Sequence, residues 1–446
     1  MRPLLRLLEL CWRLLGATSS MRERGWPKER SGGEVVRQHR PDYQIALYTA
    51  ILMLLGLVIM YAIGPQRANV LNMAVGGNYS ESYFFIKQVV SIILSGVAFA
   101  ALALIPYTIM VKRSSWLLIA GLVLCAILAI SGWANLPFAN EVNGATSWFQ
   151  LGILGSFQPA EVLKFGLLVY LAVFLGARAK EGVVNDWHKT ILPTLIISGV
   201  SLFIIVIIQR DLGTGTALLA IIATMLFVAG VNRRWLAIMA AGVLTLGLLS
   251  IVTMPHRMDR IMTFLQGDNT SIDDAGAYHI EHAKIAIGTG GLFGVGIGNS
   301  VQATGYLPEV INDSIFAVIG EIFGFVGLIS LVALFVALLM RLLRVVDRLV
   351  DVRLKLLAAG VFGWFGAHVI LNIAAIIGIF PLTGITLPLV SFGGTSMIFI
   401  AAALGLVFQL SRYTIHPSRI REETQHENTR SRRGVGRTRY ASRRSA

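Results

Sequence analysis

Three carboxylates lie at the entrance to one of the most apolar stretches of the sequence. They belong to the segment "GYLPEVINDSIFAVIGE", which contains Glu309, Asp313 and Glu321. A carboxylate beside an apolar helix is partly desolvated, and desolvation raises a carboxyl pKa toward a value suited to a general base. The alternative is a capped helix that starts at Pro308 or Asn312 and carries Asp313 in its first turn, at the positive end of the dipole. In both cases Asp313 is held rigidly at the edge of the apolar stretch.

Two other motifs place a cation beside a carboxylate. In "FQPAEVLKFG", Glu161 and Lys164 are at i and i+3 and share a helix face. This motif predicts either a structural ion pair or a cavity in which Lys164 binds a phosphate while Glu161 holds the Lys164 side chain in place. In "QRDLGTG", Asp211 either caps the following helix or contributes with Arg210 to an anion site. An anionic substrate is therefore one of two interpretations of each motif.

The glycine-rich motifs predict close packing rather than nucleotide binding. "GTGGLFGVGIG" follows no strand and precedes no Lys-Ser or Lys-Thr, as a phosphate-binding loop would. "PLTGITLPLVSFGGTS", which contains Ser391, predicts a rigid turn and close packing at the last apolar stretch. His279 and His282 lie near acidic residues, but their spacing matches no strong metal signature. We expect both histidines to be polar surface residues, and we expect no protein-bound metal.

Membrane helices must position these residues. The chain has 446 residues, of which 55% are hydrophobic and 14% charged, and its mean hydropathy is +0.70. A helix needs about 20 apolar residues to cross a hydrocarbon core about 30 Å thick. Ten segments are candidates, near residues 45–63, 84–104, 116–130, 160–177, 191–208, 213–231, 235–252, 314–339, 357–379 and 390–410. We predict an all-α polytopic membrane protein with ten transmembrane helices.

The charge distribution predicts the orientation. The chain carries 38 Lys and Arg and a net charge of +14. With both termini cytoplasmic, most of these cations fall on the cytoplasmic side, as the positive-inside rule requires. Topology therefore accounts for the charge, and we expect no nucleic acid partner. Cys11 and Cys125 fall in the N-terminal tail and in a span, so no disulfide is expected.

One membrane domain between two tails is the predicted organisation. Residues 1–42 form a basic cytoplasmic tail, 43–412 the ten-helix domain, and 413–446 an Arg-rich cytoplasmic tail that we expect to be disordered. The opening residues predict an amphipathic surface helix, or an extension upstream of a start at Met21, rather than a cleaved signal peptide. The largest outer loop, 253–312 between spans seven and eight, is long enough to contain structure of its own.

Ionisable side chains at the ends of the spans predict a cavity. Burial of such a group costs several kcal/mol unless the group is paired or faces water. The groups concerned are Glu161, Lys164, Asp211, Asp313 and Glu321. We therefore expect a hydrated cavity that opens toward the outer side.

Taken in order, the motifs resemble those of the SEDS family of bacterial shape, elongation, division and sporulation proteins, whose best-known members are FtsW and RodA. The similarity covers about residues 43–412, and its successive signatures are "NGATSWFQLGILGSFQPAEVLKF", "QRDLGTG", "YHIEHAKIAIGTGGLFGVGIGNSVQ", "YLPEVINDSIFAVIGEIFG" and "TGITLPLVSFGGTS". The resemblance implies a peptidoglycan glycosyltransferase that joins lipid II into the nascent glycan strand at the outer face of the cytoplasmic (inner) membrane. It also implies a class B penicillin-binding protein as partner, together with other membrane proteins of the division or elongation machinery.

The resemblance also implies roles for individual residues. The family's catalytic aspartate maps onto Asp313. The predicted substrate-binding residues are Trp148, Glu161, Lys164, Arg210, Asp211, Glu309 and Ser391. No tightly bound cofactor is expected, although a divalent cation, Mg²⁺ or Mn²⁺, is a candidate bridge to the lipid pyrophosphate.

Several positions depart from the family pattern. "TSW" lacks the arginine that usually precedes the tryptophan, and "QRDLGT" has Arg210 where the family has proline. One interpretation is that Arg210 supplies the missing cation. "GIGNSVQ" and "YLPE" look like FtsW, whereas "YHI" and "KIAIG" look like RodA. We favour the FtsW branch, for which the division septum is a candidate location.

Two rival functions fit parts of the same pattern. A transporter that flips lipid-linked precursors would also place polar residues in a membrane cavity. A scaffold that only recruits a transpeptidase would need no chemistry in that cavity. Of the three, we favour the glycosyltransferase.

Overall fold

Helices form nearly all of the described chain. The computed structural model describes residues 40–134, 139, 147–150, 156–252 and 275–414. Its elements are α2 (Tyr43–Val75), α3 (Tyr83–Leu104), α4 (Tyr107–Lys112), α5 (Ser114–Trp133), β1 (Phe149–Gln150), β2 (Ser156–Phe157), α6 (Pro159–Lys180), η2 (Trp187–Ile191), α7 (Leu192–Leu202), η3 (Phe203–Ile208), α8 (Leu212–Val228), α9 (Arg233–Val252), α11 (Ala275–Gly290), η5 (Gln302–Thr304), α12 (Ile315–Arg348), α13 (Val352–Ile376), α14 (Thr395–Leu410) and η6 (Ser411–Tyr413). The predicted all-α polytopic class is confirmed. Residues 1–39 and 415–446 of the two predicted tails and the first part of the predicted large outer loop lie outside the described residues.

Within the described residues, eight helical segments are long and apolar enough to cross a membrane. One of them is the continuous run from η2 through α7 to η3. The helix α8 is apolar but shorter, and α9 coincides with the seventh predicted span. Every predicted span thus falls on a helix, while the count of ten and the cytoplasmic placing of both termini stay predictions.

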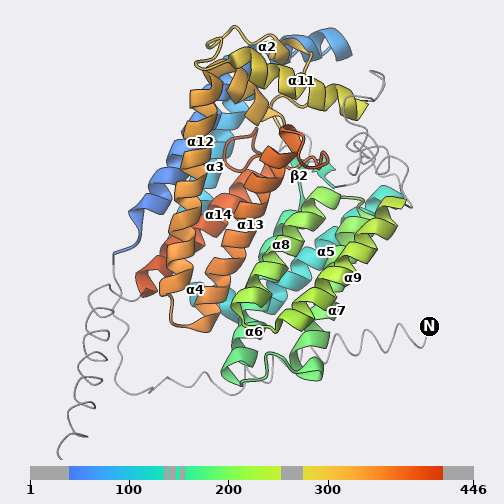
Figure 1. Cartoon of the computed structure of the whole chain (residues 1–446), viewed down its shortest axis with the longest axis vertical. Helices are drawn as coiled ribbons and strands as arrows, with labels where there is room; N and C mark the ends of the chain where they lie inside the picture. The colour runs from blue at the N-terminus through green and yellow to red at the C-terminus, as the bar shows by residue number, and fades with distance from the viewer. Residues whose placement is uncertain (1–39, 135–138, 140–146, 151–155, 253–274, 415–446) are drawn as a thin grey trace, which may run out of the picture.

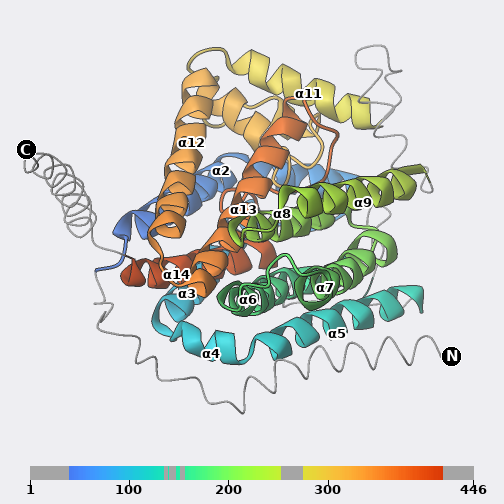
Figure 2. The ribbon, with the colours of Figure 1, turned by 60° about the horizontal axis from the view of Figure 1, so that its bottom comes forward.

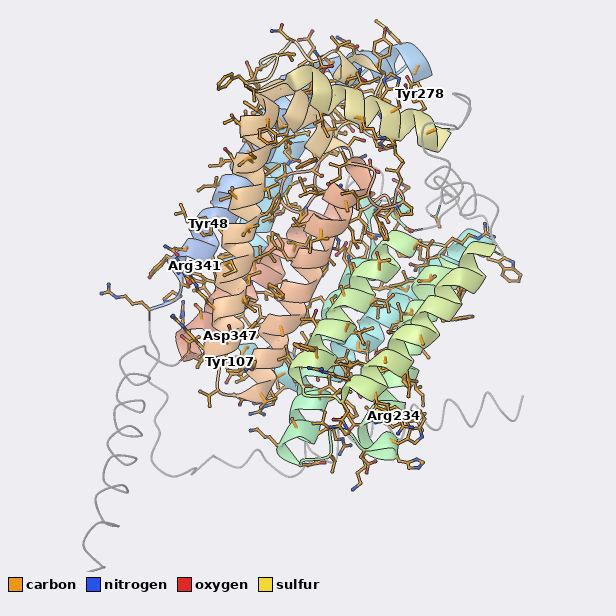
Figure 3. All side chains as sticks on the ribbon, in the orientation of Figure 1. Tyr48, Tyr107, Arg234, Tyr278, Arg341 and Asp347 are labelled. Carbon is orange, nitrogen blue, oxygen red and sulfur yellow. The ribbon has the colours of Figure 1, made fainter. Side chains whose placement is uncertain are left out.

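The helices form two groups that α13 joins (Figure 1). α2, α3, α12 and α14 lie on one side, and α5 to α9 lie on the other (Figures 1 and 2). α13 packs against α6 and α8 as well as α12 and α14. α11 lies across one end of the molecule, where Tyr278 is placed, while Arg234 lies at the opposite end (Figure 3). The first turns of α6, α8 and α12 are therefore close to the end that α11 covers.

Glycines allow the closest helix contacts. A Cβ at Gly121 of α5 would lie 2.6 Å from Leu163 Cα of α6, and one at Gly166 would lie 2.6 Å from the Leu117 carbonyl oxygen. Without side chains at these positions the two backbones approach closely, as is common between membrane helices. This contact fixes the part of α6 that carries the predicted cation and carboxylate.

The helix α2 is longer than hydropathy predicts. The apolar run ends at Ile63, but the helix continues through Pro65 to Val75. Beyond its end, Asn72 Nδ2 donates to the Tyr79 carbonyl oxygen at 2.9 Å, and the Tyr79 N–H donates to Asn72 Oδ1 at 2.8 Å. This reciprocal pair closes the return to α3, so residues 64–75, which follow the first predicted span, are helical.

The helix α12 is interrupted, although the sequence predicts one continuous span. Gly324 has φ 65° and ψ −165°, which separates a short first segment, 315–323, from the long remainder. Such a break releases backbone groups that need partners. The glycine-rich run supplies them through four hydrogen bonds: Val295 N to Glu321 O, Gly296 N to Ile322 O, Phe325 N to Gly291 O and Val326 N to Leu292 O. Close backbone packing, predicted for this run, is its observed role.

Candidate functional site

The loop that carries Asp313 is fixed by its backbone. Three consecutive carbonyl oxygens accept hydrogen bonds from residues near the C-terminal end of the fold. The bonds are Phe392 N to Ile311 O at 2.8 Å, Ser391 Oγ to Asn312 O at 2.5 Å and Asn372 Nδ2 to Asp313 O at 2.8 Å. The half-buried Asp313 side chain is thus attached to a segment that α13 and the following loop hold in place.

Glu309 and Ser391, both predicted substrate-binding residues, each bond to Asn312, the residue before Asp313. Asn312 Nδ2 donates to Glu309 Oε2 at 2.6 Å, and Ser391 Oγ donates to the Asn312 carbonyl oxygen. Glu309 has φ 48°, a left-handed conformation that non-glycine residues rarely adopt. Such conformations persist where the surroundings over-determine them, often at functional sites. In this structure both residues organise the backbone beside Asp313.

The short first segment of α12 begins just after Asp313. The helix starts at Ile315 with Ser314 as its N-cap residue, so the expectation that Asp313 lies in the first turn is wrong. The Ser314 side chain gives no capping bond; its hydroxyl donates to the Pro308 carbonyl oxygen at 2.8 Å. His279 Nε2 lies 2.5 Å from the same Ser314 Oγ. Because the serine hydrogen is used on Pro308, His279 is the donor in this contact, and α11 is thereby joined to the residue after Asp313.

Glu321 does not face an open cavity, contrary to the sequence interpretation. Its side chain is fully buried and accepts from Ser300 Oγ at 2.5 Å, Val301 N at 2.9 Å and Gln302 N at 3.2 Å. These donors all belong to the turn that follows the glycine-rich run. A buried carboxylate with several hydrogen bonds is well satisfied, so Glu321 holds that turn in place.

The Glu161 and Lys164 side chains form a buried ion pair at the start of α6. Lys164 Nζ lies 2.9 Å from Glu161 Oε1, and both residues are 1% exposed. The ammonium also lies 5.0 Å from the centre of the Trp364 ring on α13, a cation–π contact. Glu161 Oε2 and Trp364 Nε1 have no hydrogen-bond partner among the described residues. The ion-pair interpretation matches this geometry, while two polar atoms are left able to bind another group.

The hairpin and the turn before α8 meet beside the start of α6. Phe149 pairs with Phe157, which places the partly buried Trp148 next to the strand that leads into α6. Gln158, the N-cap residue of α6, donates through Nε2 to Asp211 Oδ2 at 3.2 Å. Asp211 in turn accepts from Thr214 N at 2.8 Å, so it caps α8 as one interpretation predicts.

Arg210 precedes this cap in an unusual backbone conformation. Its φ is 58° and its side chain is exposed. A left-handed arginine costs on the order of 1 kcal/mol relative to glycine. The exposed guanidinium lies next to the capped start of α8, at the same end of the molecule as the Asp313 loop.

Three buried side chains on one face of α13 link these features, and sequence reasoning missed all three. Trp364, His368 and Asn372 recur every four residues and are 1%, 4% and 1% exposed. Trp364 contacts Lys164, His368 Nδ1 lies 3.1 Å from the Trp364 carbonyl oxygen, and Asn372 binds the Asp313 carbonyl oxygen. At 1.5 Å per residue the row spans about 12 Å. The signal was present as polar residues at helical spacing in "WFGAHVILN".

The N-terminal end of α13 is capped by Asp351. Asp351 accepts from the Arg353 backbone N–H at 2.8 Å and pairs with the Arg353 guanidinium at 2.9 Å. Burial raises the pKa of the Asp351 carboxyl, but the hydrogen bonds and charge of Arg353 outweigh it, so this pKa lies below its usual value. The cap fixes the first turn of the helix that carries Trp364, His368 and Asn372.

Each histidine of α11 contacts a polar side chain. His279 is buried against Ser314, so the expectation of a surface residue is wrong for it. His282 Nδ1 lies 2.8 Å from Gln302 Oε1 and the ring stacks near Tyr306. Within the described part of the chain, no three His, Cys, Asp or Glu residues are grouped to hold a metal ion.

Comparisons with known proteins cover most of the chain. A family model described as cell cycle protein, named for FtsW, RodA and SpoVE, matches residues 43–416. The probable peptidoglycan glycosyltransferase FtsW of Nitrosomonas europaea is 32% identical over 378 residues, 83% of this chain and 93% of that protein. Stage V sporulation protein E of Bacillus subtilis is 31% identical over 376 residues, 84% of this chain and 98% of that protein.

Solved structures share the fold. A chain from a peptidoglycan synthase complex, described in terms of the structural coordination of polymerization and crosslinking, is 27% identical with a TM-score of 0.62 and covers 83% of this chain and 98% of its own length. The rod shape determining protein RodA of Thermus thermophilus is 27% identical with a TM-score of 0.57, covering 84% and 98%.

Proposed function

Because this chain belongs to the FtsW, RodA and SpoVE family and is an FtsW-like peptidoglycan glycosyltransferase of the membrane, we propose that its substrate is lipid II and its product a glycan strand. We place the reaction at the outer face of the cytoplasmic membrane, with the division septum as the site of action. The observation that carries the residue assignment is the Asp313 loop, held by three successive backbone carbonyls beside the start of a broken membrane helix.

Asp313 is the general base in this proposal. The 4-hydroxyl of the acceptor sugar attacks the anomeric carbon of the donor, its proton passes to the Asp313 carboxylate, and the lipid pyrophosphate leaves with the bonding electrons. A base must keep a fixed geometry toward the hydroxyl, because small displacements cost large factors in rate. The backbone bonds described above supply that rigidity.

Arg210 and Lys164 are the proposed cations for the pyrophosphate. Arg210 is exposed and is assigned the first contact. Lys164 is buried with Glu161, so it reaches a phosphate only after this ion pair opens. Replacing a buried ion pair with apolar residues is often neutral or stabilising, which favours a use for this pair beyond stability. Trp148 and Asp211 shape the neighbouring wall through the hairpin and the cap of α8.

No step is assigned to a resident metal, because the described residues provide no cluster of ligands for one. Mg²⁺ or Mn²⁺ would suit the pyrophosphate oxygens. We therefore propose that such a cation arrives with the substrate.

A class B penicillin-binding protein is the proposed partner, together with other membrane proteins of the division or elongation machinery. Support comes from the similar chain in a complex described as coordinating polymerization and crosslinking. The multi-pass character of the chain suits a partner in the same membrane.

The decisive experiment combines purified protein with lipid II, with and without a class B transpeptidase and a divalent cation. The proposal expects glycan strands on a gel in the absence of any other polymerase. Movement of lipid II across liposomes without glycan products would instead establish a transporter. Glycan synthesis by another protein of the complex, at a rate that substitution of Asp313 does not change, would establish this chain as a scaffold.

A further inference from the structure

Asn372 joins the Asp313 loop to the loop that follows α13. Its side-chain amide is 1% exposed, and Nδ2 donates to the Asp313 carbonyl oxygen at 2.8 Å and to the Ile385 carbonyl oxygen at 2.7 Å. A carboxamide has two N–H groups, so both are used. The opposite amide orientation would face oxygen toward both carbonyls, and the network therefore fixes the side chain as described.

These two bonds close a ring of contacts that contains Asp313. From Ile385 the chain runs to Leu387, whose N–H donates to Ser391 Oγ at 2.9 Å. Ser391 donates to the Asn312 carbonyl oxygen, which precedes Asp313 in the chain. Removing the Asn372 amide breaks this ring at the Asp313 carbonyl. That carbonyl is attached to the same Cα as the side chain that ends in the carboxylate.

We propose that Asn372 is a positioning residue that sets the orientation of the Asp313 carboxylate through the backbone. This inference rests on the proposed role of Asp313 as the base. Asn372 touches neither substrate nor reacting atoms; it acts by holding the peptide of Asp313. A misplacement of about 1 Å can cost about a hundredfold in rate, so loss of the amide reduces kcat far more than it changes KM.

Gln409 provides a matched control. It is 4% exposed, and its Nε2 donates to the carbonyl oxygens of Ala103 and Ile105 at 3.3 and 2.6 Å. It is therefore another buried amide that binds two backbone carbonyls, placed at the connection between α3 and α4 and away from Asp313. Both amides contribute to stability, but only Asn372 holds the proposed base.

The experiment measures kcat and KM for lipid II polymerisation in full-length Asn372→Leu and Gln409→Met, below the melting temperature of each variant. Asn372→Leu should lower kcat about a hundredfold with KM nearly unchanged, and Gln409→Met should keep the wild-type kcat per folded molecule. Asn372→Ser, which retains one hydrogen-bond donor, should give an intermediate kcat. It replaces Asn372→Leu in the test if the leucine variant does not fold. Wild-type kcat in a folded Asn372 variant, or an equal loss in Gln409→Met, would overturn the proposal.

Hydrogen exchange separates this inference from the proposed function. If the wild-type protein makes no glycan, the proposed function fails, and exchange then decides whether Asn372 holds the loop. The Phe392 N–H, bonded to the Ile311 carbonyl oxygen, should exchange faster in Asn372→Leu than in Gln409→Met. Equal exchange in the two variants would overturn the positioning role.

Discussion

The carboxylate of Glu321 accepts a hydrogen bond from the hydroxyl of Ser300 across 21 residues of chain, at 2.5 Å. The backbone N–H groups of Val301 and Gln302 donate to the other oxygen of the same carboxylate. One buried anion thus holds the turn after the glycine-rich run against the short first segment of α12. This fastening places Glu321 among the structural residues, apart from Asp313.

Glu321→Gln should lower the thermal stability of the protein. An amide can turn one oxygen toward these donors but not two, which leaves at least one buried donor without a partner. The loss of charge-assisted bonds should cost about 1.5–3 kcal/mol. Thermal unfolding in detergent measures the change, with Glu281→Gln on exposed α11 surface as the control. Equal melting temperatures for the two variants would contradict the assignment.

The buried pair of α6 should show strong coupling. Glu161→Gln or Lys164→Met alone should cost about 3–5 kcal/mol, because each leaves a buried charge, while the double variant should recover most of that loss. The double variant should still polymerise lipid II poorly, since Lys164, one of the two proposed pyrophosphate cations, is missing.

Arg178 and Glu181 form the control pair on the same helix. They have the same i,i+3 spacing and a 2.7 Å contact, but the side chains are 17% and 47% exposed. Neutralising both should change stability by less than about 1 kcal/mol and leave polymerisation intact. Restored polymerisation in the Glu161 and Lys164 double variant would show that the pair serves packing alone.

Asp313→Asn should abolish most activity with little effect on folding. Removing a general base typically costs about 10²–10⁴-fold, and the loop is held by backbone bonds that asparagine preserves. Lipid II polymerisation and thermal unfolding should be measured together. Asp347→Asn, at an exposed position far along α12, is the control. Full activity in folded Asp313→Asn would remove Asp313 from the mechanism.

Arg210→Gly should separate charge from backbone. Glycine adopts φ 58° without steric cost, so the turn before α8 should remain stable. Loss of a charge-assisted contact of about 1.5–3 kcal/mol should raise KM for lipid II about ten- to a hundredfold. Arg234→Gln, an exposed cation at the opposite end of the molecule, should leave KM unchanged. An unchanged KM in Arg210→Gly would exclude Arg210 from the pyrophosphate site.

Gly290→Ala and Gly288→Ala should have opposite effects although they lie two residues apart on α11. A Cβ at Gly290 would lie 1.9 Å from the Gly320 carbonyl oxygen, whereas one at Gly288 meets nothing within 4 Å. Overpacking should destabilise the first variant by about 1–3 kcal/mol or more. Alanine should stabilise the second by up to about 1 kcal/mol, because it is the better helix former. Similar melting temperatures would show that α11 does not pack closely on α12.

Hydropathy predicts the helices well because each span depends mainly on local composition. It fails where partners lie elsewhere in the chain. α2 continues past its apolar run because Asn72 and Tyr79 close its end, and α12 breaks at Gly324 because the glycine-rich run supplies the partners of the broken turn. Neither event leaves a periodic signal in the sequence.

The residues of the candidate site also divide into those that local sequence predicts and those that depend on distant partners. The carboxylates and cations are visible as charges beside apolar sequence, and Glu161 with Lys164 are close enough in sequence for their contact to be predicted. The contact of Asn372 with Asp313 joins residues 59 positions apart, and that of Glu321 with Ser300 has no helical spacing. Only the tertiary arrangement shows that Asp313, the proposed base, and Glu321, which holds the turn at Ser300, have different roles.

The break at Gly324 also has a consequence for biogenesis. The groups that satisfy the broken turn, residues 291–296, are synthesised before the turn itself at 321–326. The partners of the broken turn therefore leave the ribosome first, and the first segment of α12, 315–323, follows them. The order of translation thus matches the order in which the two sides of the break become available for pairing.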